Sequence, residues 1–334
     1  MGVKLSWKKI VQYIIFLAIA LLFLWLASRG IPFEKMFEHI KSVKLWPLSL
    51  VFIGGIGSHY LRALRWKMLI DPMGYNVDAT NTFLSIMIGY LVNLVTPRMG
   101  EVARCGVLSV YEKIPADKLA GTMIAERAFD LVTLVMLFFI TYLVEYSTVN
   151  SFVQENLFAP LLDRFSANGL ILFGIALALV VVLFVALRKK MFSSENKISG
   201  IIKNILEGLS SIGRIEKKWL FITYTFGIWF LYLFMTTLGF WAFKDLSFLS
   251  FREGLSVLSF GTIGFVVPAP GGMGSFQYFV SLTLQEMFQI EESLALAYAN
   301  VSWAAQTIVL IIGGVISLIL LPILNNKKDA KHEQ

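Results

Sequence analysis

Long apolar stretches separated by short polar segments dominate the pattern along this chain. A transmembrane helix needs about 20 consecutive, mostly apolar residues. The stretches that approach or exceed this length are 10–28, 45–61, 119–144, 168–187, 219–243 and 294–321. The pattern therefore predicts six membrane-crossing helices in an all-α polytopic membrane protein. The first is expected to be an uncleaved anchor, because its apolar core is longer than that of a signal peptide and further spans follow it.

Two further apolar stretches are each interrupted by Pro and Gly. One covers about 80–110 and is broken at TPRMG (96–100), and the other covers about 253–288 and is broken at PAPGGMG (268–274). Pro removes a backbone donor and clashes with the preceding turn, whereas Gly permits a sharp bend. A break at membrane depth must be buried in protein or face water. We therefore expect two broken, re-entrant helical hairpins, which brings the number of membrane segments to eight.

The distribution of Lys and Arg favours hairpins over two more crossings. With both termini cytoplasmic, 19 of the 29 basic residues lie on the cytoplasmic side and 7 lie outside. If each broken stretch crossed fully, the basic segment 188–218 would be extracellular, against the positive-inside rule. The expected location is a bacterial or archaeal cytoplasmic membrane, with 325–334 as a cytoplasmic tail. Amphipathic helices are expected at the inner interface over 196–215 and at the outer one over 31–44.

The order of elements repeats once along the chain. Residues from about 1 to 145 and from about 168 to 321 each give two spans, a broken hairpin and a third span. Three crossings per unit make the second unit inverted relative to the first, so the hairpin tips meet near the midplane of one integral membrane domain (1–334). Inverted repeats with discontinuous central helices are typical of transporters. The alternative is that the breaks only shape helix packing.

Six ionisable residues lie within the predicted membrane segments, where charges are costly. They are Arg98, Glu101, Arg104, Glu126, Arg127 and Asp130. Pairs such as Arg98–Glu126 or Arg104–Asp130 would be purely structural. Alternatively, Arg98 and Arg104 bind a phosphate or carboxylate headgroup bidentately, while Glu126 or Asp130 carries a coupling proton or restrains the arginines when the site is empty.

The second hairpin offers backbone groups rather than charges. The glycine-rich turn 271–274 precedes a half-helix whose amides and positive dipole end favour an anion. Asn93 and Gln277 are expected to face the same cavity or to make an interhelical hydrogen bond. The basic aromatic segment 62–67 is expected to anchor the chain at the inner membrane boundary.

Composition narrows the chemistry. The chain is 57% hydrophobic and 15% charged, and its net charge is +7. Because the basic residues concentrate in the predicted cytoplasmic loops, this charge is expected to meet anionic lipid headgroups rather than nucleic acid. The single Cys105 and the scattered His39, His59 and His332 predict no metal site and no cofactor. The chain contains no G-x-x-x-x-G-K-[ST] phosphate loop, so ATP hydrolysis is not expected.

Four strings, RALRW (62–66), TPRMGEVAR (96–104), AERAFD (125–130) and PAPGGMGSFQ (268–277), resemble the transmembrane region of lysylphosphatidylglycerol synthases. This family includes stand-alone flippase-like proteins of the UPF0104 type. The resemblance implies lipid translocation between leaflets. The positions it carries over are Arg98, Gly100, Glu101, Arg104, Glu126, Arg127, Asp130, Pro268, Gly271, Gly272 and Gly274. Many relatives have a carboxylate where this chain has Gln277, and the soluble aminoacyl-transferase domain is absent, so lysyl transfer is not expected.

The leading functional hypothesis is a flippase-like transporter that moves a phosphate-bearing phospholipid or polyprenyl lipid between leaflets. One alternative is an intramembrane lipid-modifying enzyme. The absence of a histidine from the predicted site argues against this alternative. Another is a non-transporting scaffold for envelope assembly. The expected partners are membrane lipids with anionic headgroups, together with a second copy of the chain or an envelope-biosynthesis enzyme.

Overall fold

The computed structural model describes residues 7–153 and 211–332, a part of the chain that contains helices and loops but no strand. The α-helices are α1 (Trp7–Ser28), α2 (Phe33–Lys41), α3 (Leu45–Ile70), α4 (Ala79–Val95), α5 (Gly100–Glu112), α6 (Ala116–Val144), α7 (Tyr146–Val153), α11 (Lys218–Ala242), α12 (Phe251–Val266), α13 (Ser275–Phe288) and α14 (Glu292–His332). Short 3₁₀ turns are η1 (Asp71–Met73), η3 (Ser211–Arg214), η4 (Lys244–Leu246) and η5 (Pro270–Gly272). The predicted span 168–187 and most of the predicted interfacial helix 196–215 lie outside the described residues.

Length and composition identify candidate membrane spans among these helices. Three described segments are long and apolar enough to cross a membrane, namely Ala116–Val144, Lys218–Ala242 and Glu292–Asn326. A fourth is possible if α1 and α2, which are bent by 90° relative to each other, form one broken span. These candidate spans and the helical content of the described residues agree with the prediction of an all-α membrane protein. The count of eight segments and the inverted repeats stay predictions.

The outward face of α6 shows why these helices suit a bilayer. Leu131, Val135 and Phe139 are each exposed by 61–62%. On the same helix Glu126 is fully buried. Exposed apolar side chains are favourable in hydrocarbon, whereas a carboxylate there must face the protein interior. Large exposed apolar residues also lie on α1, α11 and α14.

Helix α3 corrects one sequence expectation. The sequence predicts a span that ends before Arg62, followed by an interfacial anchor, but the helix continues to Ile70. Arg62, Arg65 and Trp66 are exposed by 5%, 0% and 0%. The anchor prediction is therefore wrong for these three residues. Neither Pro nor Gly interrupts the helix there, and the arginines have carboxylate partners on α6 that compensate their burial.

The first broken stretch forms the predicted hairpin. Helix α4 ends at Val95, α5 begins at Gly100, and the two limbs pack closely side by side. A Cβ on Gly100 would collide with the carbonyl oxygen of Gly89, so the backbones approach closely only because both positions lack a side chain. The Gly100 amide also donates to Asn93 Oδ1 at 2.7 Å, which fixes the turn.

The second broken stretch forms a similar hairpin from α12 and α13. Ser275 Oγ donates to the carbonyl oxygen of Gly264 at 2.6 Å and ties the two limbs together. The second limbs of both hairpins end on a non-glycine residue in the left-handed conformation, Lys113 (φ 55°) after α5 and Gln289 (φ 54°) after α13. The two hairpins therefore share the way their second limbs end, and the duplication of the unit stays a prediction.

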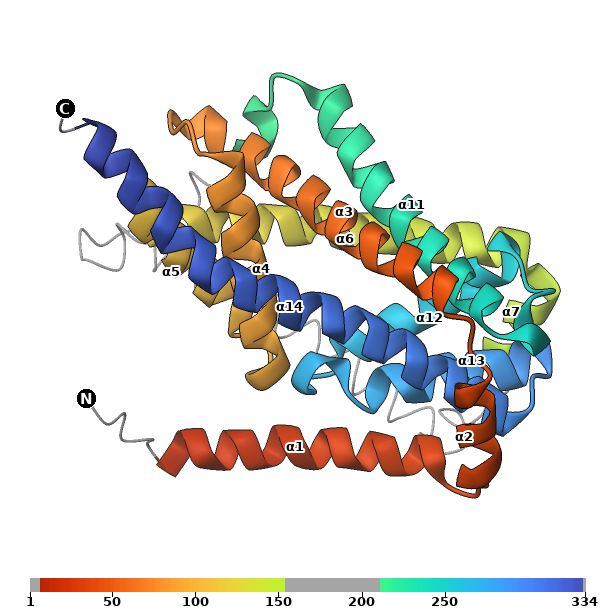
Figure 1. Cartoon of the computed structure of the whole chain (residues 1–334). Coiled ribbons are helices and arrows are strands. Elements are labelled where there is room, and N and C mark those ends of the chain that lie inside the picture. The colour runs from red at the N-terminus through yellow and green to blue at the C-terminus, as the bar shows by residue number, and fades with distance from the viewer. Residues whose placement is uncertain (1–6, 154–210, 333–334) are drawn as a thin grey trace, which may run out of the picture.

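The turns of the two hairpins lie next to each other near the middle of the molecule (Figure 1). The α4–α5 hairpin extends toward the left of that view and the α12–α13 hairpin toward the right. A Cβ on Gly271 would lie 2.7 Å from Leu94 Cδ2, and Arg98 Nη2 donates to the carbonyl oxygen of Val266 at 2.6 Å. The two hairpin tips are therefore in contact, and their position at the membrane midplane stays a prediction.

Candidate functional site

A cavity of about 470 Å³ lies where the two hairpin tips meet. Its walls come from α3, α4, α6, α11, α12 and α14, from the first turns of α5 and α13, and from both hairpin turns. The charged side chains in its lining are Arg62, Arg98, Glu101, Arg127 and Asp130. Much of the remaining wall is apolar, as at Val51, Leu134 and Val309. A pocket with a few convergent polar groups in an apolar wall is typical of a ligand site.

Glu126, on α6, is the centre of a buried charge cluster beside the cavity. Its Oε1 accepts from Arg62 Nη1 at 2.8 Å and from Arg65 Nη2 at 3.3 Å. Its Oε2 lies 2.8 Å from Arg104 Nη2, as an ion pair that lacks hydrogen-bond geometry. The carboxylate is fully buried, so three arginines share one desolvated negative charge.

Asp130, one turn further along α6, engages the same arginines of α3. Its Oδ2 lies 2.8 Å from Arg62 Nη1, and its Oδ1 lies 2.6 Å from Arg65 Nη2. Residues four apart on a helix share a face, so α6 presents Glu126 and Asp130 together to α3. The two arginines and two carboxylates therefore fix α3 against α6.

Arg104 lies away from the cavity and does not line it. Its guanidinium lies over the ring of Trp66, 4.6 Å from the ring centre. The Trp66 Nε1 in turn donates to Thr122 Oγ1 at 2.9 Å. Cation–π contact and the Glu126 ion pair thus join α5 to α3 and α6. The structure brings together neither Arg98 with Glu126 nor Arg104 with Asp130, the pairs considered from the sequence.

Arg127 and Arg98 are the cavity arginines with the weakest protein partners. Arg127 is 40% exposed and lies 3.7 Å from Glu101 Oε1 and 3.6 Å from Asp130 Oδ2, longer than the other contacts in the cluster. Its Nε has no partner among the described residues. Arg98 is exposed in the hairpin turn and donates to the Val266 carbonyl oxygen. Both guanidiniums therefore retain capacity to bind an anion.

The glycine-rich turn of the second hairpin mainly provides packing. The amides of Gly272 and Gly274 already donate, to the carbonyl oxygen of Ala269 at 3.0 Å and to Gln277 Oε1 at 2.8 Å. Gly274 packs against the backbone of α1. Gln277 is 1% exposed and does not line the cavity.

Other positions expected from the sequence do reach the cavity. Asn93, Pro268, Gly271 and Gly272 line it. The Gly271 carbonyl oxygen also accepts from Trp303 Nε1 at 2.9 Å. In this way α14 holds the second turn in place at the edge of the cavity.

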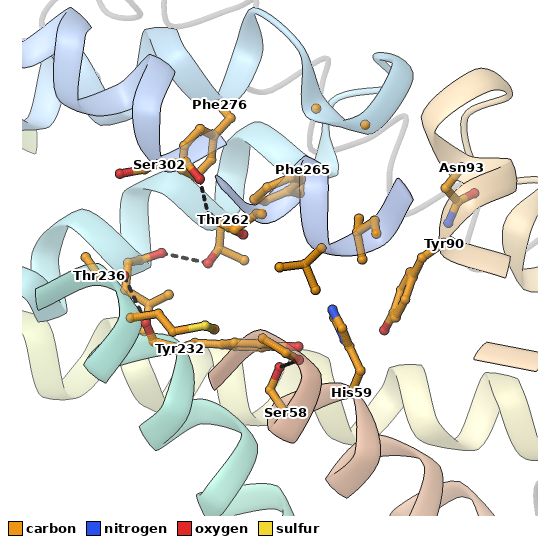
Figure 2. Close-up of a pocket in the computed structure, with 18 of the residues that line it drawn as sticks. Ser58, His59, Tyr90, Asn93, Tyr232, Thr236, Thr262, Phe265, Phe276 and Ser302 are labelled. Atoms are coloured by element: carbon orange, nitrogen blue, oxygen red, sulfur yellow. Dashed lines mark hydrogen bonds between the residues drawn. The ribbon is translucent and has the colours of Figure 1, made fainter. Parts of the chain in front are cut away.

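The sequence argument missed several polar residues of this site. His59 lines the cavity beside Tyr90, with ring centres 4.7 Å apart (Figure 2). The statement that no histidine lies at the site is therefore wrong. His59 and Arg62 are three residues apart on α3, and this helical spacing is the signal that places both on the cavity side. No cluster of metal-ligating side chains is found among the residues that the structure describes.

Long apolar helices around a buried ion-pair network and a cavity are the features of a helical membrane protein with a central polar site. The family model for the lysylphosphatidylglycerol synthase transmembrane region matches residues 13–314, and the chain belongs to this family. A UPF0104 membrane protein of Methanocaldococcus jannaschii is 31% identical over 172 residues, which cover 50% of this chain and 51% of that relative. The match thus spans about half the length of that relative. No solved structure matches the chain.

Proposed function

We propose that this protein translocates an anionic, phosphate-bearing lipid between the leaflets of a membrane. The observation that carries the proposal is the charge of the cavity. Three arginines and two carboxylates line it, and the adjoining cluster adds Arg65, Arg104 and Glu126. Five arginines therefore face three carboxylates, and an excess of positive charge in a cavity with an apolar wall attracts an anion.

The headgroup is proposed to bind between the two hairpin turns. Arg127 and Arg98 are the arginines whose guanidiniums have spare donors, and a guanidinium fork matches the geometry of a phosphate. The apolar wall and the apolar outer faces of the helices support a ligand whose chains stay in the bilayer. Relative movement of the two hairpins then exposes the headgroup on the opposite side. Arg104 has a positioning role, because it holds α5 against α3 and α6.

Lipid exchange in proteoliposomes tests this function. Purified protein is reconstituted with headgroup-labelled phosphatidylglycerol, and the labelled lipid exposed in the outer leaflet is followed with time. Exchange is expected to exceed that of protein-free vesicles and to fall at least about tenfold in Arg127→Gln, because a charge-assisted contact contributes about 1.5–3 kcal/mol. Arg29→Gln, which changes an exposed arginine at the end of α1, is the matched control. Equal exchange in wild type, Arg127→Gln and protein-free vesicles would exclude translocation of this lipid.

A lipid-modifying enzyme is the second candidate, and His59 is the observation that favours it. An imidazole in a cavity beside arginines is a candidate general base. The neighbouring carboxylates are less suited to acid–base work because each is already engaged by arginines. Incubation of purified protein with radiolabelled lipid distinguishes the two functions, since an enzyme gives a new labelled product and a transporter does not. The proton-coupling role of Glu126 and Asp130 stays a prediction.

A further inference from the structure

The second limbs of the two hairpins, α5 and α13, match in their backbone conformation. Lys113 follows Arg98 by 15 residues, with φ values of 55° and 63°. Gln289 follows Gly274 by 15 residues, with φ values of 54° and 79°. A positive φ is uncommon outside glycine, so its recurrence just before and just after both helices gives a well-defined alignment of α5 with α13.

The close contact between the two limbs of each hairpin agrees with this alignment, which places Gly100 on Phe276. A Cβ on Gly89 would lie 2.7 Å from the carbonyl oxygen of Gly100. A Cβ on Gly264 would lie 2.6 Å from Cα of Phe276. In both hairpins, therefore, a glycine of the first limb lies against the position two residues after the one with positive φ.

The two second limbs differ in how they are covered. Helix α5 packs mainly against α4 and α6, and α13 packs in the same way against α12 and α14. Helix α13 also packs against α1, where the ring centre of Tyr278 lies 5.7 Å from that of Phe23. The position on α5 that matches Tyr278 is Val102, which is 59% exposed. Among the described helices, α5 therefore lacks a counterpart of α1 on this face.

The chain between α7 and η3 has to run the length of α6. It begins after α7, which directly follows α6 and packs against it. It ends at η3, beyond which Ile215 shares a core with Ile114 and Leu119 at the start of α6. The 29 residues of α6 are about 44 Å long. The apolar run 168–187 within this stretch is long enough to cover that distance across a membrane.

Segment 168–187 is also the counterpart of α1 in the predicted repeat, because each is the first span of its unit. Residues 18–21 of α1 read AIAL, and residues 176–179 read ALAL. Aligning these two strings places Val181 on Phe23. Since the helix before the second hairpin's unit covers that hairpin through Phe23, Val181 is the position expected to lie against the first hairpin.

We propose that segment 168–187 packs as a helix against the outward face of α5, with Val181 beside Val102. Val110 on α5 is 71% exposed and lies eight residues after Val102, a spacing that keeps both on one apolar face. Segment 168–187 contains no charged residue, which suits such a contact. The first span of each unit then holds the hairpin of the other unit. This packing does not depend on which lipid the cavity binds.

Thiol cross-linking of the full chain in membranes tests this packing. In the Cys105→Ala background, Val102→Cys is combined with Val181→Cys or with Leu183→Cys. Leu183 is the matched control, because positions two apart on a helix point in nearly opposite directions. A short bifunctional thiol reagent is expected to link the Val181→Cys pair within one chain, with a yield severalfold above that of the Leu183→Cys pair. Gel mobility separates these links from cross-linked dimers, and mass spectrometry of proteolytic peptides identifies the linked cysteines.

The positive control for cross-linking is the pair Phe23→Cys and Tyr278→Cys. These side chains already lie in contact between α1 and α13, so the same reagent is expected to link them. Melting temperature is measured for every variant, and only folded variants are compared.

Labelling from the lipid phase is a second measurement, made on the unmodified chain. A lipid-soluble carbene reagent reacts with side chains that face hydrocarbon. Val135 and Phe139, on the outward face of α6, are exposed by 61% and 62% and are expected to be labelled strongly. Val102 and Val110 are expected to be labelled severalfold less, because segment 168–187 covers them.

The results distinguish the possible occupants of this face of α5. A link within one chain between Val102→Cys and Val181→Cys, with weak labelling of Val102, supports the proposed packing. A cross-linked dimer through Val102→Cys overturns it in favour of a second copy of the chain. No link in a sample where the positive control is linked also overturns it. If the positive control stays unlinked, the labelling decides, and labelling of Val102 as strong as that of Phe139 overturns the packing in favour of lipid.

Discussion

Arg104 Nη2 lies 2.8 Å from Glu126 Oε2, so the second limb of the first hairpin is joined to helix α6 by an ion pair buried on both sides. The other oxygen of Glu126 is engaged by Arg62 and Arg65 of α3. A single carboxylate thus connects three helices next to the cavity. Such a group is expected to matter for stability more than for direct contact with a ligand.

Replacing Glu126 is expected to destabilise the protein strongly. Glu126→Gln leaves buried guanidiniums without their shared negative charge, and breaking a buried ion pair from one side costs about 3–5 kcal/mol. The measurement is the midpoint of thermal or denaturant unfolding of the purified protein. Glu292→Gln, which changes an exposed carboxylate at the start of α14, is expected to shift stability by less than about 0.5 kcal/mol.

A double substitution separates charge burial from packing. In Glu126→Gln the additional change Arg104→Met removes one of the uncompensated charges, so the double variant is expected to be more stable than the sum of the two single effects predicts. Strictly additive effects would contradict a direct interaction between the two side chains.

Close contact between the limbs of the first hairpin predicts opposite effects for two glycines of α5. Gly100→Ala is expected to lower stability by about 1–3 kcal/mol, because the added Cβ would collide with the backbone of Gly89. Gly106→Ala is expected to raise it by about 0.5–1 kcal/mol, since nothing lies within 4 Å of a Cβ there and Ala favours a helix. The unfolding midpoints of both variants are compared with that of the wild type under the same conditions, which measures the two stability changes. A Gly100→Ala variant as stable as the wild type would argue against the close packing of α4 and α5.

The contact between Arg98 and the carbonyl oxygen of Val266 predicts a change in access to the cavity. Ser302→Cys in a Cys105→Ala background places one thiol in the cavity lining. Adding Arg98→Met removes the hydrogen bond between the hairpin tips, and the rate of thiol modification is expected to rise about fivefold, as one hydrogen bond contributes about 1 kcal/mol.

The control for this experiment is Arg252→Met. Arg252 pairs with Glu145 outside the cavity, so its loss is expected to leave the modification rate unchanged. A rate that is equally low with and without Arg98 would show that this contact does not restrict access.

The hairpin topology predicts opposite sides for the ends of the two hairpins. Lys113→Cys follows α5 and Gln289→Cys follows α13, each introduced singly in the Cys105→Ala background. A membrane-impermeant thiol reagent is expected to modify Gln289→Cys in intact cells and Lys113→Cys only after permeabilisation. Modification of Lys113→Cys in intact cells would instead favour two full crossings at the broken stretches.

The sequence by itself determined the class of the protein and the positions of most of its helices. The helix limits near Ala116–Val144 and Lys218–Ala242, and both breaks, follow from runs of apolar residues and from Pro and Gly. These signals are local, because length, hydropathy and backbone freedom act on neighbouring residues whatever lies across the fold.

Only the tertiary structure decided which charges meet. The sequence placed Arg62 and Arg65 at the membrane boundary, and it gave six membrane charges whose sum is zero. The fold buries both arginines against Glu126 and Asp130, and this leaves the site with an excess of positive charge. Ion pairing depends on the distance between charged groups on helices that are remote in sequence. The periodicity of a single helix shows which of its residues share a face, but it does not predict that distance. The same reason explains why the sequence did not show that Arg104 supports the cavity without lining it.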